Sequence, residues 1–107
     1  MKLATNPFEK IVSGKKIIES RLYDEKRQQI NLGDQIEFSC ADDATKKVLT
    51  NVKALYRYNF FNDLFTDFSA EYFGGSSKDA LLKEIEVFYS KEEQAKYGVL
   101  GIKIELV

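Results

Sequence analysis

The hydrophobic period of the chain changes near residue 60, and this change limits the folds that the sequence can adopt. Residues 48–58 alternate in polarity, which is typical of a β-strand. Residues 61–68 instead place apolar side chains three and four positions apart, which is typical of an amphipathic helix. Residues 99–106 then return to alternation. Strands, then helices, then one returning strand predict an α+β fold, in which two or three helices pack on a small sheet or barrel.

The first half of the chain contains at least three predicted strands. Residues 17–22 and 35–40 join the long strand at residues 48–58, and the run NLGD at residues 31–34 marks a turn between the first two. Residues 41–47 look like a polar hairpin loop. In the long strand Val52, Ala54, Tyr56 and Tyr58 share one parity, which predicts that they share one face of the sheet.

Helix signals stand at both ends of the chain. Asn6 can cap a short N-terminal helix, with Pro7 at its first position and Glu9 completing a capping box; Ser13 and Gly14 end it. A second and a third helix are predicted at residues 61–68 and 80–89, joined by a flexible segment at residues 74–77 whose serines can cap the latter. Residues 90–97 predict another short helix that stops at Gly98.

Length and residue types limit the chemistry. The 107 residues fit one domain, residues 1–107. The sequence has neither a signal-peptide pattern nor an apolar run long enough to cross a membrane, so we expect a soluble, cytoplasmic protein. Cys40 is the only cysteine and there is no histidine, which excludes a zinc site of the usual nitrogen and sulfur ligands within one chain. We expect neither a metal nor a cofactor.

Charge is divided unevenly along the chain. Residues 1–60 carry 11 Lys and Arg against 8 Asp and Glu, whereas residues 61–107 carry 5 against 9, for a net charge of -1. A strongly basic domain would favour non-specific binding to phosphate backbones, and this chain is not one. Any contact with nucleic acid therefore has to be local.

Three charged residues stand out in the first predicted strand. In a strand at residues 17–22, Glu19 and Arg21 point to the same side, and Lys16 at the strand entry, close to Gly14, can turn toward them. An exposed Glu–Arg pair on a strand is ordinarily a weak surface ion pair worth about 0–1 kcal/mol. From the pattern alone this structural explanation is favoured.

The same residues resemble a family signature. Gly14, Lys16, Glu19 and Arg21 match the order Gly-x-Lys-x-x-Glu-x-Arg of the ASCH domain, the activating-signal-cointegrator homology family of PUA-like β-barrels. The segments NPFEKIVSG, NLGDQIEF and YGVLGIKIEL are also similar to that family, so the resemblance spans essentially the whole chain. The chain is thus similar to a small bacterial single-domain member, which implies a PUA-like β-barrel or a strongly bent mixed sheet.

The resemblance also implies a function. It suggests a cleft that binds RNA or a nucleotide-like small molecule, with Lys16, Glu19 and Arg21 as ligand-binding residues. Arg21 offers a planar fork suited to phosphate or a base edge, Lys16 is a compact cation, and Glu19 can accept from an exocyclic amine or orient Arg21. Tyr56, Tyr58 and Phe60 could stack on a base, although alternating aromatics in a strand are more often core.

A hydrolase is the alternative function. Some ASCH proteins resemble acetylcytidine amidohydrolases, and others are proposed to cleave RNA; carried over, Lys16, Glu19, Arg21 and Glu71 would be the catalytic residues. Glu19 stands where the amidohydrolases have a hydroxyl residue. A lysine base must be neutral, and a nearby Glu19 would keep Lys16 charged, so Glu19 itself would have to act as the base.

Other readings of single features remain open. Cys40 could be a nucleophile, but without a histidine to activate it a buried structural thiol is favoured. Residues 74–77 could cradle a phosphate, but they lack the spacing and the lysine of a P-loop and favour a joint. A protein-interaction module is a third functional class, for which an exposed apolar patch around Phe61, Phe65 and Phe68 would be the distinguishing feature.

Overall fold

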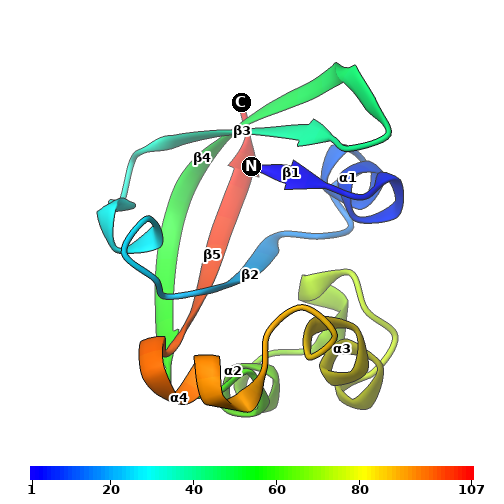
Figure 1. The fold of residues 1–107 in the computed structure, drawn as a ribbon. Coiled ribbons are helices and arrows are strands. Elements are labelled where there is room, and N and C mark those ends of the chain that lie inside the picture. The colour runs from blue at the N-terminus through cyan, green and yellow to red at the C-terminus, as the bar shows by residue number, and fades with distance from the viewer.

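A curved five-stranded sheet organises the computed structural model, which describes residues 1–107 (Figure 1). The strand order is β1-β3-β4-β5-β2. Strands β1 and β3 pair in parallel, and the other neighbours are antiparallel. The strands comprise β1 Lys2–Leu3, β2 Ile18–Leu22, β3 Gln35–Cys40, β4 Asp43–Tyr58 and β5 Val99–Leu106. This mixed half-barrel confirms the predicted α+β class and the strongly bent sheet.

Four α-helices pack on the sheet, one in each of the four segments with a predicted helix. Figure 1 shows α2, α3 and α4 gathered at one end of the sheet, with α1 beside β1. No helix is long and apolar enough to cross a membrane. The helices are α1 Thr5–Val12, α2 Phe61–Asp67, α3 Lys78–Ile85 and α4 Lys91–Tyr97, and two 3₁₀ helices lie at η1 Arg27–Gln29 and η2 Ala70–Phe73.

A β-bulge in β4 changes which side chains share a face. Val52 pairs with Ile104 but Ala54 pairs with Lys103, so Lys53 is the extra residue. An extra residue reverses the alternation that follows it. The prediction that Val52 and Tyr56 lie on one face is therefore wrong, because they lie on opposite faces.

The bulge fits a sheet that is buried on both sides. Along β5, Leu100 belongs to one apolar core with Phe38 and Val52, whereas its neighbour Val99 belongs to a second core with Phe61. The second core is formed mainly with α2 and α3. Buried Phe61 and Phe65 lie within it and Phe68 packs against it, so the expected exposed patch on these three side chains does not exist.

Local signals at the helix ends are only partly confirmed. Helix α1 is capped by Ala4 without a side-chain bond, so Asn6 is not the cap. Pro7 still lies in the first turn, where its missing N–H costs nothing. Helix α3 is capped by Ser77, as predicted, and Ser90 and Glu93 form a capping box on α4.

Two further element predictions need correction. The expected hairpin loop at 41–47 is almost entirely strand, because β4 begins at Asp43. Phe88 and Tyr89 were expected on the third helix, but α3 ends at Ile85. Cys40 is buried in the first core, as its structural reading predicts.

Candidate functional site

Strand β2 places two of the predicted residues on one face of the sheet. Glu19 lies opposite Ile102 of β5, and Arg21 lies opposite Leu100. Directly opposed residues of antiparallel strands project to the same side, so both charged side chains lie on the face that carries the first core. The predicted alternation of this strand is confirmed.

Lys16 reaches the same place from outside the strand. Its backbone N–H donates to the carbonyl of Lys10 in α1 at 3.0 Å, and the N–H of Ile17 donates to the carbonyl of Tyr72 in η2 at 2.9 Å. These bonds tie the segment before β2 to elements on both sides. As a result the Lys16 ammonium lies 2.8 Å from Oε1 of Glu19.

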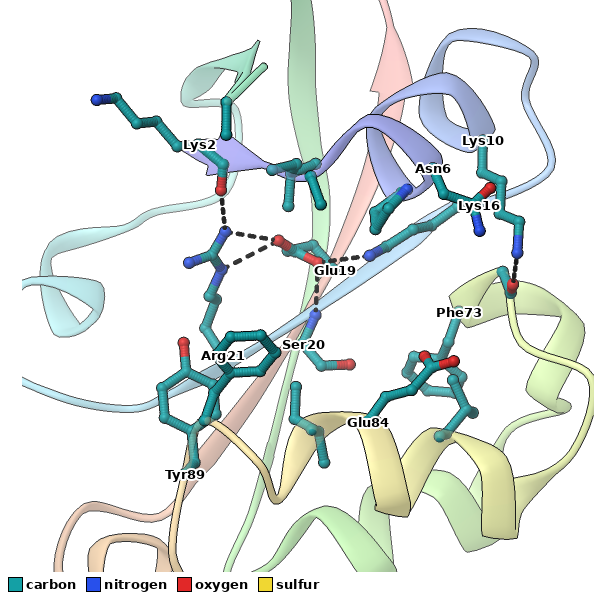
Figure 2. A pocket seen from close by; sticks show the side chains of 18 of the residues that line it. Lys2, Asn6, Lys10, Lys16, Glu19, Ser20, Arg21, Phe73, Glu84 and Tyr89 are labelled. Carbon is teal, nitrogen blue, oxygen red and sulfur yellow. Dashed lines mark hydrogen bonds and ion pairs between the residues drawn. The ribbon is translucent and has the colours of Figure 1, made fainter.

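Both oxygens of the Glu19 carboxylate contact groups of its own chain (Figure 2). Oε1 pairs with the ammonium of Lys16 and accepts from the backbone N–H of Ser20 at 3.2 Å. Oε2 accepts from Nε of Arg21 at 3.0 Å and lies 2.9 Å from Nη2 of the same guanidinium. Each oxygen therefore has two nitrogen neighbours from its own chain.

The ion pairs of Glu19 are more buried than an ordinary surface ion pair. The side chain of Glu19 is 4% exposed, against 12% for Lys16 and 14% for Arg21. The interpretation as a weak exposed pair is therefore wrong. We name these three residues the Lys-Glu-Arg cluster.

Electrostatics keep the Lys-Glu-Arg cluster ionised. Burial by itself raises the pKa of Glu19, but the charges of Lys16 and Arg21 and their hydrogen bonds outweigh it, so the pKa lies below its ordinary value. Burial likewise opposes the charge of Arg21, and the Glu19 carboxylate, helped by Tyr89, more than offsets this and raises the pKa of Arg21. The cluster carries two positive charges and one negative charge.

The cluster borders a cavity of about 400 Å³. Lys16 and Arg21 keep donors that Glu19 does not use, and Nη2 of Arg21 also donates to the carbonyl of Lys2 at 3.2 Å. The cavity is further lined by the basic residues Lys2 and Lys10, the acidic residues Asp42 and Glu84, and the aromatic residues Phe65, Phe73, Phe88 and Tyr89. Four basic and three acidic side chains, counting the cluster itself, leave a small excess of positive charge.

A lysine of α1 links this helix to the segment after η2 at the border of the cavity. Nζ of Lys10 donates to the carbonyl of Gly74 at 2.6 Å. Gly74 has φ +77°, and a Cβ there would lie 3.1 Å from Cδ of Lys10 and 3.2 Å from Cβ of Lys16. Glycine therefore allows this backbone to approach the two lysines closely. At the end of the segment 74–77, Ser77 caps α3, as predicted.

Comparison with known proteins supplies the family. The model of the ASCH domain matches residues 1–107, the whole chain. The chain belongs to the ASCH domain family. No curated protein matches it.

Solved structures share the fold of this ASCH domain. The crystal structure of the hypothetical protein PH0355 is 38% identical, with a TM-score of 0.88 over 100% of this chain and 96% of that one. The solution structure of protein PF0455 from Pyrococcus furiosus is 37% identical, with a TM-score of 0.77 over 100% and 94%. ASCH from Zymomonas mobilis, 17% identical, has a TM-score of 0.57 over 98% of this chain and 64% of its own, which shows the fold alone.

The ASCH fold does not bring Glu71 to the cavity. Glu71 is exposed on η2 and is not among the lining residues, which instead include Glu84 of α3. Glu84 forms no ion pair, and in Figure 2 its carboxylate points toward the cavity. Sequence reasoning missed Glu84 because it looked like one more polar position on the solvated face of an amphipathic helix.

The aromatic residues of the ASCH cavity are Phe65, Phe73, Phe88 and Tyr89. Tyr56 and Tyr58 do not line it and pack against the second core, as the favoured interpretation of these residues predicts. Phe88 is 75% exposed because α3 ends before it, and this exposure was not visible in a run that fits the helical period. No group of three or more potential metal ligands lies together in the structure.

Proposed function

We propose that this ASCH domain binds RNA or a nucleotide-like ligand in the cavity that the Lys-Glu-Arg cluster borders. The observation that supports this most is the buried carboxylate of Glu19, which pairs with both cations. It fixes a lysine and an arginine at the cavity with donors to spare. Two oriented cations are suited to a phosphate group, and the arginine fork also suits a base edge.

In this proposal Glu19 orients the two cations and does not touch the ligand. Both of its oxygens contact nitrogen atoms of Lys16, Ser20 and Arg21 within the chain. Arg21 keeps Nη1 free of Glu19, and Lys16 spends one of its three N–H groups on that carboxylate. The ligand contacts are then Lys16 and Arg21, held in place before binding, which lowers the entropic cost of recognition.

Two aromatic side chains give the proposed ligand a surface for its base. Phe88, which is 75% exposed, and half-buried Tyr89 line the same cavity as the cations. Bases stack on aromatic rings with about 1–3 kcal/mol each. Cations beside the exposed ring of Phe88 suit a nucleotide, whose phosphate and base they can contact together.

The same geometry weighs against the hydrolase alternative. Lys16 meets Glu19 as an ammonium in an ion pair, whereas a general base requires the neutral amine. The carboxylate of Glu19 is held by two cations, and a carboxylate whose pKa is lowered is a poor proton acceptor. The cluster thus favours binding over proton transfer.

The proposal is tested by binding and by turnover together. Arg21→Lys keeps the charge but removes the fork, and we expect it to weaken cytidine monophosphate binding at least tenfold in calorimetry. Arg27→Lys is the matched control, because Arg27 is also a paired arginine but contacts Asp24 away from the cavity. Equal affinities of the two variants would overturn the proposal. If the native protein hydrolyses acetylcytidine and Lys16→Ala does not, the proposed binding function would be replaced by a hydrolase function.

A further inference from the structure

A second hollow in the molecule lies outside the Lys-Glu-Arg site. It has a volume of about 440 Å³ and shares no lining residue with the first cavity. Its lining includes Tyr23, Arg57, Asn59, Lys96 and Tyr97 and no acidic residue. Both charges in its wall are therefore positive.

The two cations of this hollow rest on tyrosine rings. The guanidinium of Arg57 lies 4.1 Å from the centroid of Tyr23, and Nζ of Lys96 lies 5.0 Å from the centroid of Tyr97. Neither cation forms an ion pair, unlike Lys16, Arg21 and Arg27. A guanidinium stacked on a ring leaves its N–H groups in the plane free to donate.

The sheet relates this hollow to the first site. Leu100 of β5 lies opposite Arg21 of β2 on one side and opposite Arg57 of β4 on the other. Opposed side chains share a face, so both arginines project from the same face of the sheet, and Figure 1 shows β5 between the two strands. Two strand spacings separate their backbones by about 10 Å.

We propose that the second hollow binds a neighbouring nucleotide of a single-stranded RNA whose first nucleotide occupies the Lys-Glu-Arg cavity. Arg57 and Lys96 would contact its phosphate, and Asn59, which lines the same hollow, offers an amide for hydrogen bonds to the rest of the nucleotide. The inference rests on the proposed function and narrows its ligand from a free nucleoside to an oligonucleotide. It also agrees with the net charge of -1, because two small basic sites can bind phosphates locally without making the whole domain basic.

The test compares two probes on matched variants. A fluorescein-labelled octamer of uridine reports oligonucleotide binding by anisotropy, and unlabelled cytidine monophosphate reports the first cavity by calorimetry. The double variant Arg57→Gln and Lys96→Gln removes both cations. The control Lys53→Gln and Lys103→Gln removes two exposed lysines from β4 and β5 that do not line the hollow.

The expected result is selective. The double variant should bind the octamer at least tenfold more weakly, with cytidine monophosphate affinity unchanged. The log–log salt dependence of its octamer binding should become about 0.7 shallower for each phosphate that the variant no longer neutralises. Octamer affinity within twofold of the control would overturn the inference while leaving the proposed function standing.

Two other outcomes concern the proposed function as well as the inference. Octamer binding that depends on Arg57 and Lys96 but is unaffected by Arg21→Lys would overturn the proposed function and, with it, the inference that one RNA occupies both sites. Absence of binding of either probe to the native protein would overturn both.

Discussion

Glu19 holds Arg21 twice through one oxygen, with Oε2 3.0 Å from Nε and 2.9 Å from Nη2. The other oxygen lies 2.8 Å from Nζ of Lys16. A single buried carboxylate therefore sets the position of both cations at the cavity. Its removal is expected to affect stability and binding together.

Glu19→Gln should lower the free energy of unfolding by about 1–3 kcal/mol, because two partly buried cations lose their counter-charge. Chemical denaturation measures this. Glu37→Gln is the control, since Glu37 pairs with Lys47 on the surface, where each side chain is more than half exposed. The decrease for this control should stay below about 0.5 kcal/mol. Similar decreases in the two variants would mean that the cluster does not stabilise the fold.

The stabilisation by Glu19 should depend on pH. Because the pKa of Glu19 is lower in the folded protein than its ordinary value of 4.5, its stabilisation is complete above that value and disappears as the pH falls through the folded pKa. The difference in Tm between the native protein and Glu19→Gln should therefore be constant at pH 6–7 and shrink below about pH 4.5. A difference that grows on acidification would contradict the ionised, ion-paired state of Glu19.

Phe88→Ala should weaken nucleotide binding about five- to tenfold because base stacking is removed, with Tm nearly unchanged. Phe88 is 75% exposed, so its removal opens no cavity in the core. Val87→Ala is the control, because Val87 is 79% exposed and does not line the cavity. Calorimetry with cytidine monophosphate checks the affinities, and equal values for both variants would remove Phe88 from the site.

Gln94→Ala should destabilise the fold by about 1–3 kcal/mol, since it leaves a buried donor unpaired. Gln94 is 1% exposed; it accepts from the N–H of Phe61 at 3.0 Å and donates to the carbonyl of Tyr89 at 3.3 Å. The variant should also shift the NMR signals of Tyr89. Gln29→Ala, at an exposed position, should be neutral; a neutral Gln94→Ala would show that this link is dispensable.

The change of hydrophobic period near residue 60 predicted the α+β class. The spacing of apolar residues reflects which face of a segment is buried, and this spacing differs between a strand and a helix. The same signal failed at Lys53, where one extra residue reverses the faces of β4 without changing the composition. It also failed for β1, since two residues, Lys2–Leu3, are too short to show a period.

In the candidate site, too, the residues fixed by a local pattern could be predicted, and those placed by packing between elements could not. Glu19 and Arg21 could be placed together because alternation along one strand fixes their side. Glu84 and Phe88 could not, because their approach to the cavity depends on where α3 ends and how it packs against the sheet. The ion pair of Glu19 with Lys16 could not be placed in the same way, because Lys16 lies outside the strand.

The most direct measurement follows the side-chain N–H of Arg21 by NMR during titration with cytidine monophosphate. If the cluster binds the ligand, the Arg21 Nε–H signal and the backbone N–H signal of Ser20 should shift saturably, while the Nε–H of Arg27 stays fixed. An Arg21 signal that stays in place at millimolar ligand, or that moves no more than that of Arg27, would contradict the proposed binding role of the cluster.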